Sequence, residues 1–228
     1  MAGGAHPLDH PIWSALTTRQ ARYGGDGPLA RRFDETIGPF AAASDDGAEA
    51  VAALAALAHG EDDMSLLEPN PPPPPPGIEL KLSAAGVQMV ARAFTRGEHA
   101  FAPEPLSEAD APEMLELALL TKPGPFRART HTLGRFLGVR ENGRLIAMAG
   151  ERLQMDGFVE ISAVCTHPDH RGRGLAGALM RAVGDRILRE GDTPFLHAYA
   201  ANTGAIALYE RLGFKHRADV THAMWTRT

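Results

Sequence analysis

The sequence has little cysteine, no long apolar run and no excess of positive charge. Its single cysteine, Cys165, cannot form an intrachain disulfide, so the fold needs no oxidising compartment. The most apolar stretch, residues 48–58, has 11 residues and is rich in alanine, whereas about 20 are needed to span a bilayer. The N-terminus shows no basic region followed by an apolar core, which predicts no signal peptide. We therefore expect a cytoplasmic protein with no membrane partner.

The charge balance excludes a general attraction to nucleic acid. The 23 basic and 28 acidic residues give a net charge of −5, which does not favour binding to a polyanion or to an anionic membrane. An anionic ligand would have to be held by a local site. The 228 residues, with 44% hydrophobic side chains, suffice for one sizeable domain or two small ones with a buried core.

Six consecutive prolines divide the chain into two unequal parts. Residues 71–76, followed by Gly77, favour a polyproline II spacer of roughly 19 Å, at about 3.1 Å per residue. Such a run serves as a linker or surface loop or, less often, as the ligand of a proline-recognition domain. We expect an N-terminal extension over 1–77 that ends in a Pro-rich linker (71–77), a connecting segment over 78–100 and a main domain over 101–228.

The N-terminal extension carries helical patterns and no readable chemistry. Residues 48–59 have apolar side chains at helical spacing, with Gly60 as a stop signal, and Trp13, Leu16 and Tyr23 indicate another short helix. The alanine-rich helix could form a homodimer contact or bind a partner, although packing of its small-residue face against the main domain is the commoner role.

Helix-like and strand-like patterns alternate after residue 101. Ser107 begins a capped amphipathic helix that ends at Lys122-Pro123, and Asn142-Gly143 favours a hairpin turn. A strand followed by a helix and another strand predicts a parallel crossover in an α/β fold. The further elements expected are strands at 135–140, 144–153, 158–166 and 194–200, helices at 175–187 and 203–211, and C-terminal strands from Phe214 onward.

The turn after the strand 158–166 is rich in glycine and leads into a helix. Backbone N–H groups at such a turn and at the first residues of the helix point toward one spot, where the helix dipole also favours negative charge. Gly172, Gly174 and Gly177 remove side chains that would block a close approach. The segment therefore predicts an anion site, although tight turns and helix packing also require glycine.

Two other phosphate motifs fit this turn less well. A P-loop would need Gly-Lys-Ser/Thr, which is absent here. The three glycines do match Gly-x-Gly-x-x-Gly, the dinucleotide-binding pattern, but that pattern expects an acidic residue at the end of the following strand. Residues 195–200 offer only His197 and Tyr199 there.

Two motifs in this part of the chain resemble the GNAT superfamily of acyl-CoA-dependent N-acyltransferases. The family's hallmark is Arg/Gln-x-x-Gly-x-Gly/Ala after a strand, which Arg171, Gly174 and Ala176 match. The segment from Asn202 to Phe214 is similar to the family's second signature, in which Asn and Tyr stand seven residues apart before Leu-Gly-Phe. The resemblance covers residues 101–228. It implies a mixed central sheet flanked by helices, with parallel strands splayed around an acyl-CoA cleft.

The resemblance also implies roles for the matching residues. Acetyl-CoA would be the cosubstrate, with its pyrophosphate on the turn, its pantetheine amides along the preceding strand and Asn202 on its arm. Tyr209 would protonate the departing thiolate, which a hydroxyl near the sulfur makes a better leaving group; its alternative role is that of a core aromatic residue. The implied cofactor-binding residues are Val164, Cys165, Thr166, Arg171, Gly172, Arg173, Gly174, Leu175, Ala176, Gly177 and Asn202.

A base should take the proton that the acceptor amine loses. Glu160 is the first candidate, because a carboxylate inside an apolar strand is costly unless it has a function or a partner. His197 is the second, at a position where some members of the family present a carboxylate. A salt-bridged Glu160 and a hydrogen-bonded core His197 are equally good alternatives.

Two further interpretations of this region, a cysteine nucleophile and a metal site, are less favoured. Cys165 as a nucleophile is less common than a buried structural cysteine. His167 and His170 lack further ligands at metal-binding spacing, so we expect no metal.

Together these features predict an N-acetyltransferase that moves an acetyl group from acetyl-CoA directly to a primary amine of a small molecule or peptide. One alternative is a different acyl donor or an amino-acid acceptor, as in glycine-acyltransferase-like proteins. Another is a non-catalytic acyl-CoA-binding module with the proline run as a docking element.

Overall fold

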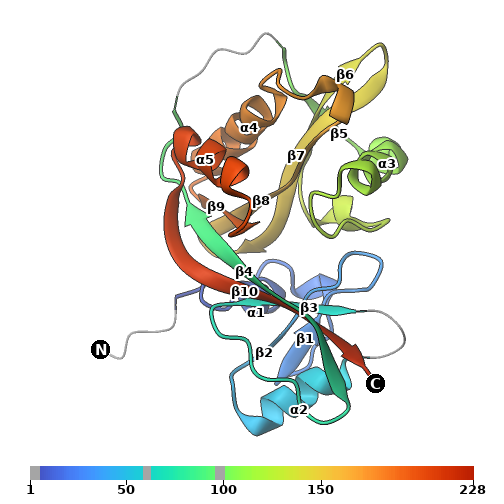
Figure 1. The fold of residues 1–228 in the computed structure, drawn as a ribbon, viewed down its shortest axis with the longest axis vertical. Coiled ribbons are helices and arrows are strands. Elements are labelled where there is room, and N and C mark those ends of the chain that lie inside the picture. Colours follow the sequence, from blue (N-terminus) through green and yellow to red (C-terminus); the bar gives the residue numbers. More distant parts are fainter. Residues whose placement is uncertain (1–5, 59–62, 96–100) are drawn as a thin grey trace.

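A computed structural model describes residues 6–58, 63–95 and 101–228. Eight strands form one sheet in the order β3-β10-β4-β9-β8-β7-β6-β5, and two short strands pair separately (Figure 1). The helices and strands of the first 95 residues are α1 (Pro11–Thr17), η1 (Ala21–Tyr23), β1 (Ala30–Arg32), β2 (Ala41–Ala43), α2 (Ala48–Ala56), β3 (Met64–Glu68) and β4 (Ile78–Val90).

The elements after residue 101 follow the predicted alternation. They are β5 (Glu104–Leu106), η2 (Glu108–Asp110), α3 (Ala111–Thr121), η3 (Thr130–Leu133), β6 (Phe136–Glu141), β7 (Arg144–Met155), β8 (Phe158–Thr166), η4 (Pro168–His170), α4 (Leu175–Arg189), β9 (Thr193–Tyr199), α5 (Thr203–Leu212) and β10 (Lys215–Arg227). The hairpin turn between β6 and β7 has Asn142 and Gly143 at φ 52° and 80°, as a tight turn of this kind requires. The mixed α/β fold expected from the sequence is confirmed. One expectation was wrong, because a single 13-residue strand, β10, replaces the C-terminal strands.

Helices cover both faces of the sheet. Leu175, Leu179 and Val183 of α4 pack with one set of strand residues, including Val139 and Ile161. Met114, Leu117 and Ala118 of α3 pack with Met148 of β7, whose neighbours in the strand, Ala147 and Ala149, belong to the set under α4. Because successive residues of a strand face opposite sides, α3 and α4 lie on opposite faces, as Figure 1 shows.

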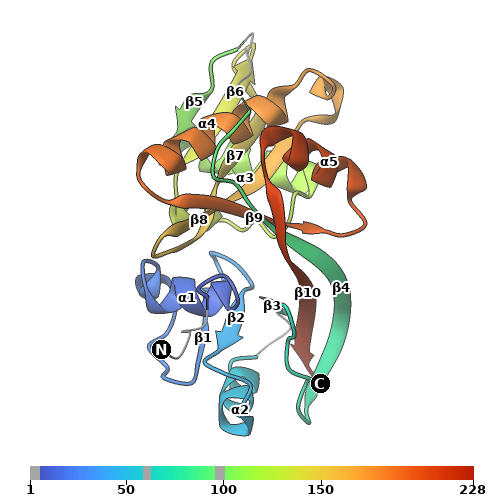
Figure 2. The same cartoon turned by 90° about the vertical axis from the view of Figure 1, so that its left-hand side faces the viewer.

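The sheet crosses the boundaries expected at residues 77 and 101. β4, which lies within the expected connecting segment 78–100, pairs antiparallel with β10 on one side and with β9 on the other. β3 from the expected extension pairs with the far side of β10, and the proline run joins β3 to β4. Figures 1 and 2 show β4 and β10 reaching from the α4–α5 part of the molecule to the α1–α2 part.

The N-terminal helices pack against the shared sheet. Ala50 and Leu54 of α2, the alanine-rich helix, join a buried cluster with Leu66 of β3 and Trp225 of β10. The helix therefore uses its small-residue face to cover the sheet. Gly60, expected to stop this helix, lies outside the described residues. Among the residues that the structure describes, no helix combines the length and hydropathy of a transmembrane segment.

The parallel pair β8 and β9 separates after three residues. Pairing joins Phe158, Val159 and Glu160 to residues 193–195 and stops there. On its other side, β8 pairs with β7 in a ladder interrupted by two register shifts. Within β8, Ala163 has φ 53°, in the left-handed region that a non-glycine residue rarely adopts. The sheet thus opens between β8 and β9 beyond Glu160.

Candidate active site

The glycine-rich turn leads into α4, a 15-residue helix whose N-cap is Gly174. Gly172 and Gly174 have φ 76° and 77°, and a side chain added at either would meet nothing within 4 Å. The helix has no acidic residue in its first turn, so its unpaired N–H groups face an open, electropositive space. An anion can approach this backbone closely.

Two arginines lie in this turn, and they differ in their partners. Arg173 forms an ion pair with Glu141 at 2.9 Å, and its hydrogen bond holds the pKa of that carboxyl below its usual value. The guanidinium of Arg171 is exposed and makes no hydrogen bond or ion pair with the residues that the structure describes. Arg171 is therefore the arginine available to a bound anion.

Two other residues of this segment face the protein instead. Leu175 is 2% exposed and belongs to the core, so only its backbone can face a ligand. Gly177 faces Leu208 and Leu212 of α5, where an added side chain would lie 3.8 and 3.9 Å from them. Gly177 thus faces the α4–α5 contact and not the open side of the turn.

The edge of β8 that faces β9 has no strand partner between Ile161 and Thr166. Val164 and Thr166 are half-buried, while Cys165 directs its side chain into the cluster under α3. Burial raises the pKa of the Cys165 thiol to about 11, which leaves it protonated at neutral pH. Cys165 is thus a buried structural cysteine, and only its backbone faces the opening.

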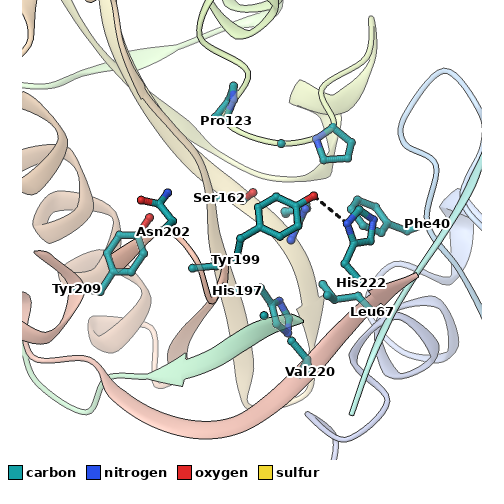
Figure 3. A pocket seen from close by; sticks show the side chains of 15 residues that line it. Phe40, Leu67, Pro123, Ser162, His197, Tyr199, Asn202, Tyr209, Val220 and His222 are labelled. Carbon is teal, nitrogen blue, oxygen red and sulfur yellow. Dashed lines mark hydrogen bonds between the residues drawn. The ribbon is translucent and has the colours of Figure 1, made fainter. Parts of the chain in front are cut away.

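A pocket lies in this opening, between β8 and β9. Asn202 and Tyr209 of α5 line it on one side; Asn202 also caps α5 by accepting a hydrogen bond from the N–H of Ala205 at 3.3 Å. Burial raises the pKa of Tyr209, so its hydroxyl stays protonated well above neutral pH. Figure 3 shows Tyr209 beside Asn202, with Tyr199 in the centre of the pocket.

The carboxylate of Glu160 is fully buried and ion-paired behind this pocket. Arg152 donates to it from Nε at 2.7 Å and from Nη2 at 2.6 Å, and the N–H of Leu153 donates at 3.3 Å. Burial alone would raise the pKa of Glu160, but the charge and hydrogen bonds of Arg152, with a further hydrogen bond from His197, hold it at about 2. These contacts argue against Glu160 as the base, because so acidic a group is a poor proton acceptor.

Both ring nitrogens of His197 are engaged. The side-chain amide nitrogen of Gln88 donates to the carbonyl of Leu8 at 2.9 Å and lies 3.0 Å from Nε2 of His197. The amide oxygen of Gln88 accepts from Arg217 at 2.8 Å. With the amide oriented in this way, Nε2 of His197 accepts and Nδ1–H donates to Glu160 at 2.7 Å. The lone pair that His197 would need as a base is occupied.

The two loop histidines make local contacts. Nδ1 of His167 accepts from the N–H of Asp169 at 3.3 Å, and Nδ1 of His170 lies 3.2 Å from Glu141. Within residues 6–58, 63–95 and 101–228, no three His, Cys, Asp or Glu side chains gather as a metal site would require.

Comparison with known proteins identifies the family. The family model described as FR47-like protein matches residues 136–226. A solved structure of an acetyltransferase of the GNAT family from Novosphingobium aromaticivorans is 43% identical, with a TM-score of 0.92, over 98% of this chain and 99% of that one. The chain belongs to the GNAT family.

Two curated relatives match a shorter part of the chain. Mycothiol acetyltransferase from Corynebacterium aurimucosum is 38% identical over 72 residues, which are 31% of this chain and 23% of that protein. The [Ribosomal protein bS18]-alanine N-acetyltransferase of Escherichia coli is 35% identical over 75 residues, which are 32% of this chain and 50% of that protein. The chain thus aligns with half or less of the length of these relatives.

Several side chains of the GNAT pocket were missed at the sequence level. Tyr199 of β9 donates to or accepts from Nδ1 of His222 on β10 at 2.9 Å, and both line the pocket (Figure 3). Phe40 and Leu67 from the N-terminal segment complete the wall. None lies in a local motif. The available signal was His222 itself, which is followed by the apolar residues Ala223, Met224 and Trp225.

Proposed function

We propose that this chain transfers an acetyl group from acetyl-CoA to a primary amine. The observation that carries the proposal is the opening between β8 and β9, where the unpaired edge of β8 and Tyr209 lie around one pocket. Acetyl-CoA would supply the acetyl thioester. An acceptor amine can reach the same pocket, so transfer needs no covalent enzyme intermediate.

The residues present fit acetyl-CoA. The open space at Gly172 and Gly174 and the N–H groups that begin α4 suit a pyrophosphate, and the exposed Arg171 adds a positive charge. The unpaired backbone at residues 164–166 suits the amides of a pantetheine arm, which would add to β8 as a strand does. Asn202, at the start of α5, lies where the arm would enter the pocket.

Tyr209 is the proton donor in this proposal. Its hydroxyl stays protonated at neutral pH because burial raises its pKa, and it lines the pocket at the α5 side. From there it would give its proton to the sulfur as the thiolate leaves. The position of Tyr209 in the family's second motif supports the same role.

The acceptor is proposed to be an amine of a small molecule or peptide. The name of the E. coli relative describes N-acetylation of an alanine, which supports an amine acceptor. A second candidate, an amino acid, is favoured by Arg152. Nε and Nη2 of Arg152 donate to Glu160. Nη1 of Arg152 makes no hydrogen bond with the described residues, and Arg152 lines the pocket. Nη1 could therefore bind a carboxylate of the acceptor.

The proposal is tested by two measurements. One follows the release of free thiol from acetyl-CoA with a panel of amines and amino acids, and the other measures the acetyl-CoA Kd by calorimetry. We expect release with at least one acceptor. Tyr209→Phe should lower kcat on the order of 1000-fold and leave the acetyl-CoA Kd unchanged. Tyr23→Phe, which removes a hydroxyl outside the pocket, is the matched control. Tight binding with no release for any acceptor would instead identify a non-catalytic acyl-CoA-binding module.

A further inference from the structure

Three polar side chains from three strands form a chain of hydrogen bonds that starts in the pocket. The hydroxyl of Tyr199 on β9 lies 2.9 Å from Nδ1 of His222 on β10, and Nε2 of His222 lies 3.1 Å from Oγ of Ser65 on β3. Tyr199 and His222 line the pocket, whereas Ser65 is fully buried behind it. The chain of side chains thus leads from the pocket into the sheet.

The sequence of β4 makes this contact possible. β4 lies between β9 and β10, so the Tyr199 side chain must cross it to reach His222. The β4 residues paired with these two are Gly86, opposite Tyr199, and Ala84, opposite His222. Paired residues of an antiparallel sheet share a face, so only small groups stand beneath the crossing ring.

The surroundings of His222 keep its imidazole neutral. The residue is 7% exposed, and burial first, then the charge of Arg152, lowers its pKa below 6.5. The titratable or charged groups that face it are Tyr199 from β9 and Arg152 from β7; its contacts from β3 and β4, Ser65 and Ala84, are uncharged.

A neutral His222 has one N–H and one ring lone pair, and the Ser65 and Tyr199 hydroxyls can each donate or accept, so both tautomers satisfy the two contacts. In the tautomer with its hydrogen on Nε2, the ring donates to Ser65 and the lone pair of Nδ1 accepts from the Tyr199 hydroxyl. Tyr199 is 47% exposed, so its oxygen remains open to a molecule in the pocket. Glu160 and His197 are poorer proton acceptors, because Arg152 donates to the carboxylate of Glu160 and Gln88 donates to the imidazole of His197.

We propose that Tyr199 takes the proton of the acceptor amine and passes its own proton to His222. The proposal rests on the acetyl transfer proposed above. Tyr199 is the catalytic residue because it touches the acceptor, and His222 acts through it. Ser65 is a positioning residue that holds the imidazole in the tautomer that accepts at Nδ1.

Atoms and charges balance in this step. The bond that forms joins the amine nitrogen to the acyl carbon, and the bond that breaks joins that carbon to the thioester sulfur. The proton on nitrogen moves to the Tyr199 oxygen while the Tyr199 proton moves to Nδ1 of His222, which becomes an imidazolium. The sulfur takes its proton from Tyr209. Solvent then removes the proton from His222 and returns one to Tyr209.

Kinetics at saturating acetyl-CoA and amine test the relay. Tyr199→Phe should lower kcat on the order of 100-fold and leave the acetyl-CoA Kd unchanged. In the unaltered protein kcat should fall as the pH drops below 6.5, because His222 can no longer accept a proton once it is charged. His222→Gln keeps an acceptor for Tyr199 and a donor for Ser65 but cannot titrate, so its lowered kcat should not change with pH in this range.

Matched variants separate the relay from a general disturbance. Tyr23→Phe removes a tyrosine hydroxyl outside the pocket, and His216→Gln changes an exposed histidine on the same strand, β10. Both should keep the kcat and pH profile of the unaltered protein. Urea unfolding of all four variants establishes that each is folded under the assay conditions.

An NMR titration of ¹⁵N-histidine-labelled protein without acetyl-CoA gives a second readout. We expect His222 to carry its hydrogen on Nε2 and to titrate below pH 6.5, and Ser65→Ala to lower the population of this tautomer. A His222 protonated on Nδ1 at neutral pH would overturn the relay even if Tyr199→Phe were inactive.

The remaining outcomes are distinct. A Tyr199→Phe variant with kcat within threefold of the unaltered protein overturns the relay and leaves the proposed acetyl transfer standing. An acid limb that persists in His222→Gln overturns it as well, because the titrating group is then another residue. No thiol release by the unaltered protein with any amine overturns the acetyl transfer and the relay together.

Discussion

The two walls of the pocket are built in different ways. The side proposed to hold acetyl-CoA comprises two continuous segments, residues 164–177 and 202–209, of which Asn202 and Tyr209 line the pocket, and it offers mainly backbone groups and a positive charge. The wall proposed to face the acceptor joins Phe40, Leu67 and His222, which lie far apart in the chain, to Tyr199. Backbone groups of one stretch can be recognised as a motif, whereas side chains gathered from distant strands cannot.

The difference implies that changes to one wall should affect one substrate. A substitution at the turn should alter the acetyl-CoA Kd and leave the amine KM unchanged. A substitution at the opposite wall should do the reverse. The buried ion pair of Glu160 with Arg152, of which only Arg152 lines the pocket, should act on stability first.

Among the changes that test this difference, the largest effect is expected from Glu160→Gln. Removing one partner of a buried ion pair leaves the charge of Arg152 uncompensated, which costs about 3 kcal/mol of unfolding free energy. Urea denaturation at pH 7 measures this loss. Glu49→Gln, at an exposed position in α2, is the control and should change the unfolding free energy by less than about 0.5 kcal/mol. A loss below about 1 kcal/mol for Glu160→Gln would show that the pair does not hold this wall.

The same pair predicts a pH dependence of stability. The pKa of Glu160 is about 2 in the folded protein, below its ordinary value of 4.5, so its contribution is fully present above pH 4.5. It is lost as the pH falls from 4.5 toward 2. Urea unfolding across this range should show a smaller loss in Glu160→Gln than in the unaltered protein.

At the turn, Gly174→Ala should weaken acetyl-CoA binding about 10-fold and leave the amine KM unchanged. A side chain at φ 77° costs roughly 1–2 kcal/mol and also enters the space of the anion. Gly191→Ala is a close control, because Gly191 has φ 89° at the opposite end of α4. Calorimetry should show an unchanged Kd for the control. An equal loss in both variants would mean that backbone strain, and not the turn itself, weakens binding.

At the acceptor wall, Phe40→Leu should raise the amine KM about fivefold and leave the acetyl-CoA Kd unchanged. The Phe40 ring lines the pocket and lies 4.6 Å from the Arg152 guanidinium, a cation–π contact worth about 1 kcal/mol. Phe94→Leu, the same change on the α4 side of the sheet, is the control. A change confined to the acetyl-CoA Kd would break the division between the two walls.

The smallest effect is expected from Arg171→Ala, which should raise the acetyl-CoA Kd about threefold at low salt. Exposed charge contacts are weak and are screened, so the difference should shrink as the salt concentration rises. Arg189→Ala removes an equal charge at the far end of α4. If both variants weaken binding equally, Arg171 acts only through the overall charge.

The local elements of the second half of the chain were predictable because each has a local cause. Asn142-Gly143 sets the hairpin, and the apolar spacing of Leu175, Leu179 and Val183 sets α4. β4 was missed, because its alternation is broken by small residues and its pairing partners are more than 100 positions away. Gln88, on that strand, occupies His197, so the state of that candidate base could not be predicted without β4.

The sequence by itself determined the family, the turn around Gly174 and the position of Tyr209, because these depend on spacing within short segments. Only the tertiary structure decided what surrounds each titratable group. It paired Glu160 with Arg152, and it brought Tyr199 to His222 across Gly86 of β4. A side chain's capacity to accept a proton depends on burial and on neighbouring charges, and long-range strand pairing sets both.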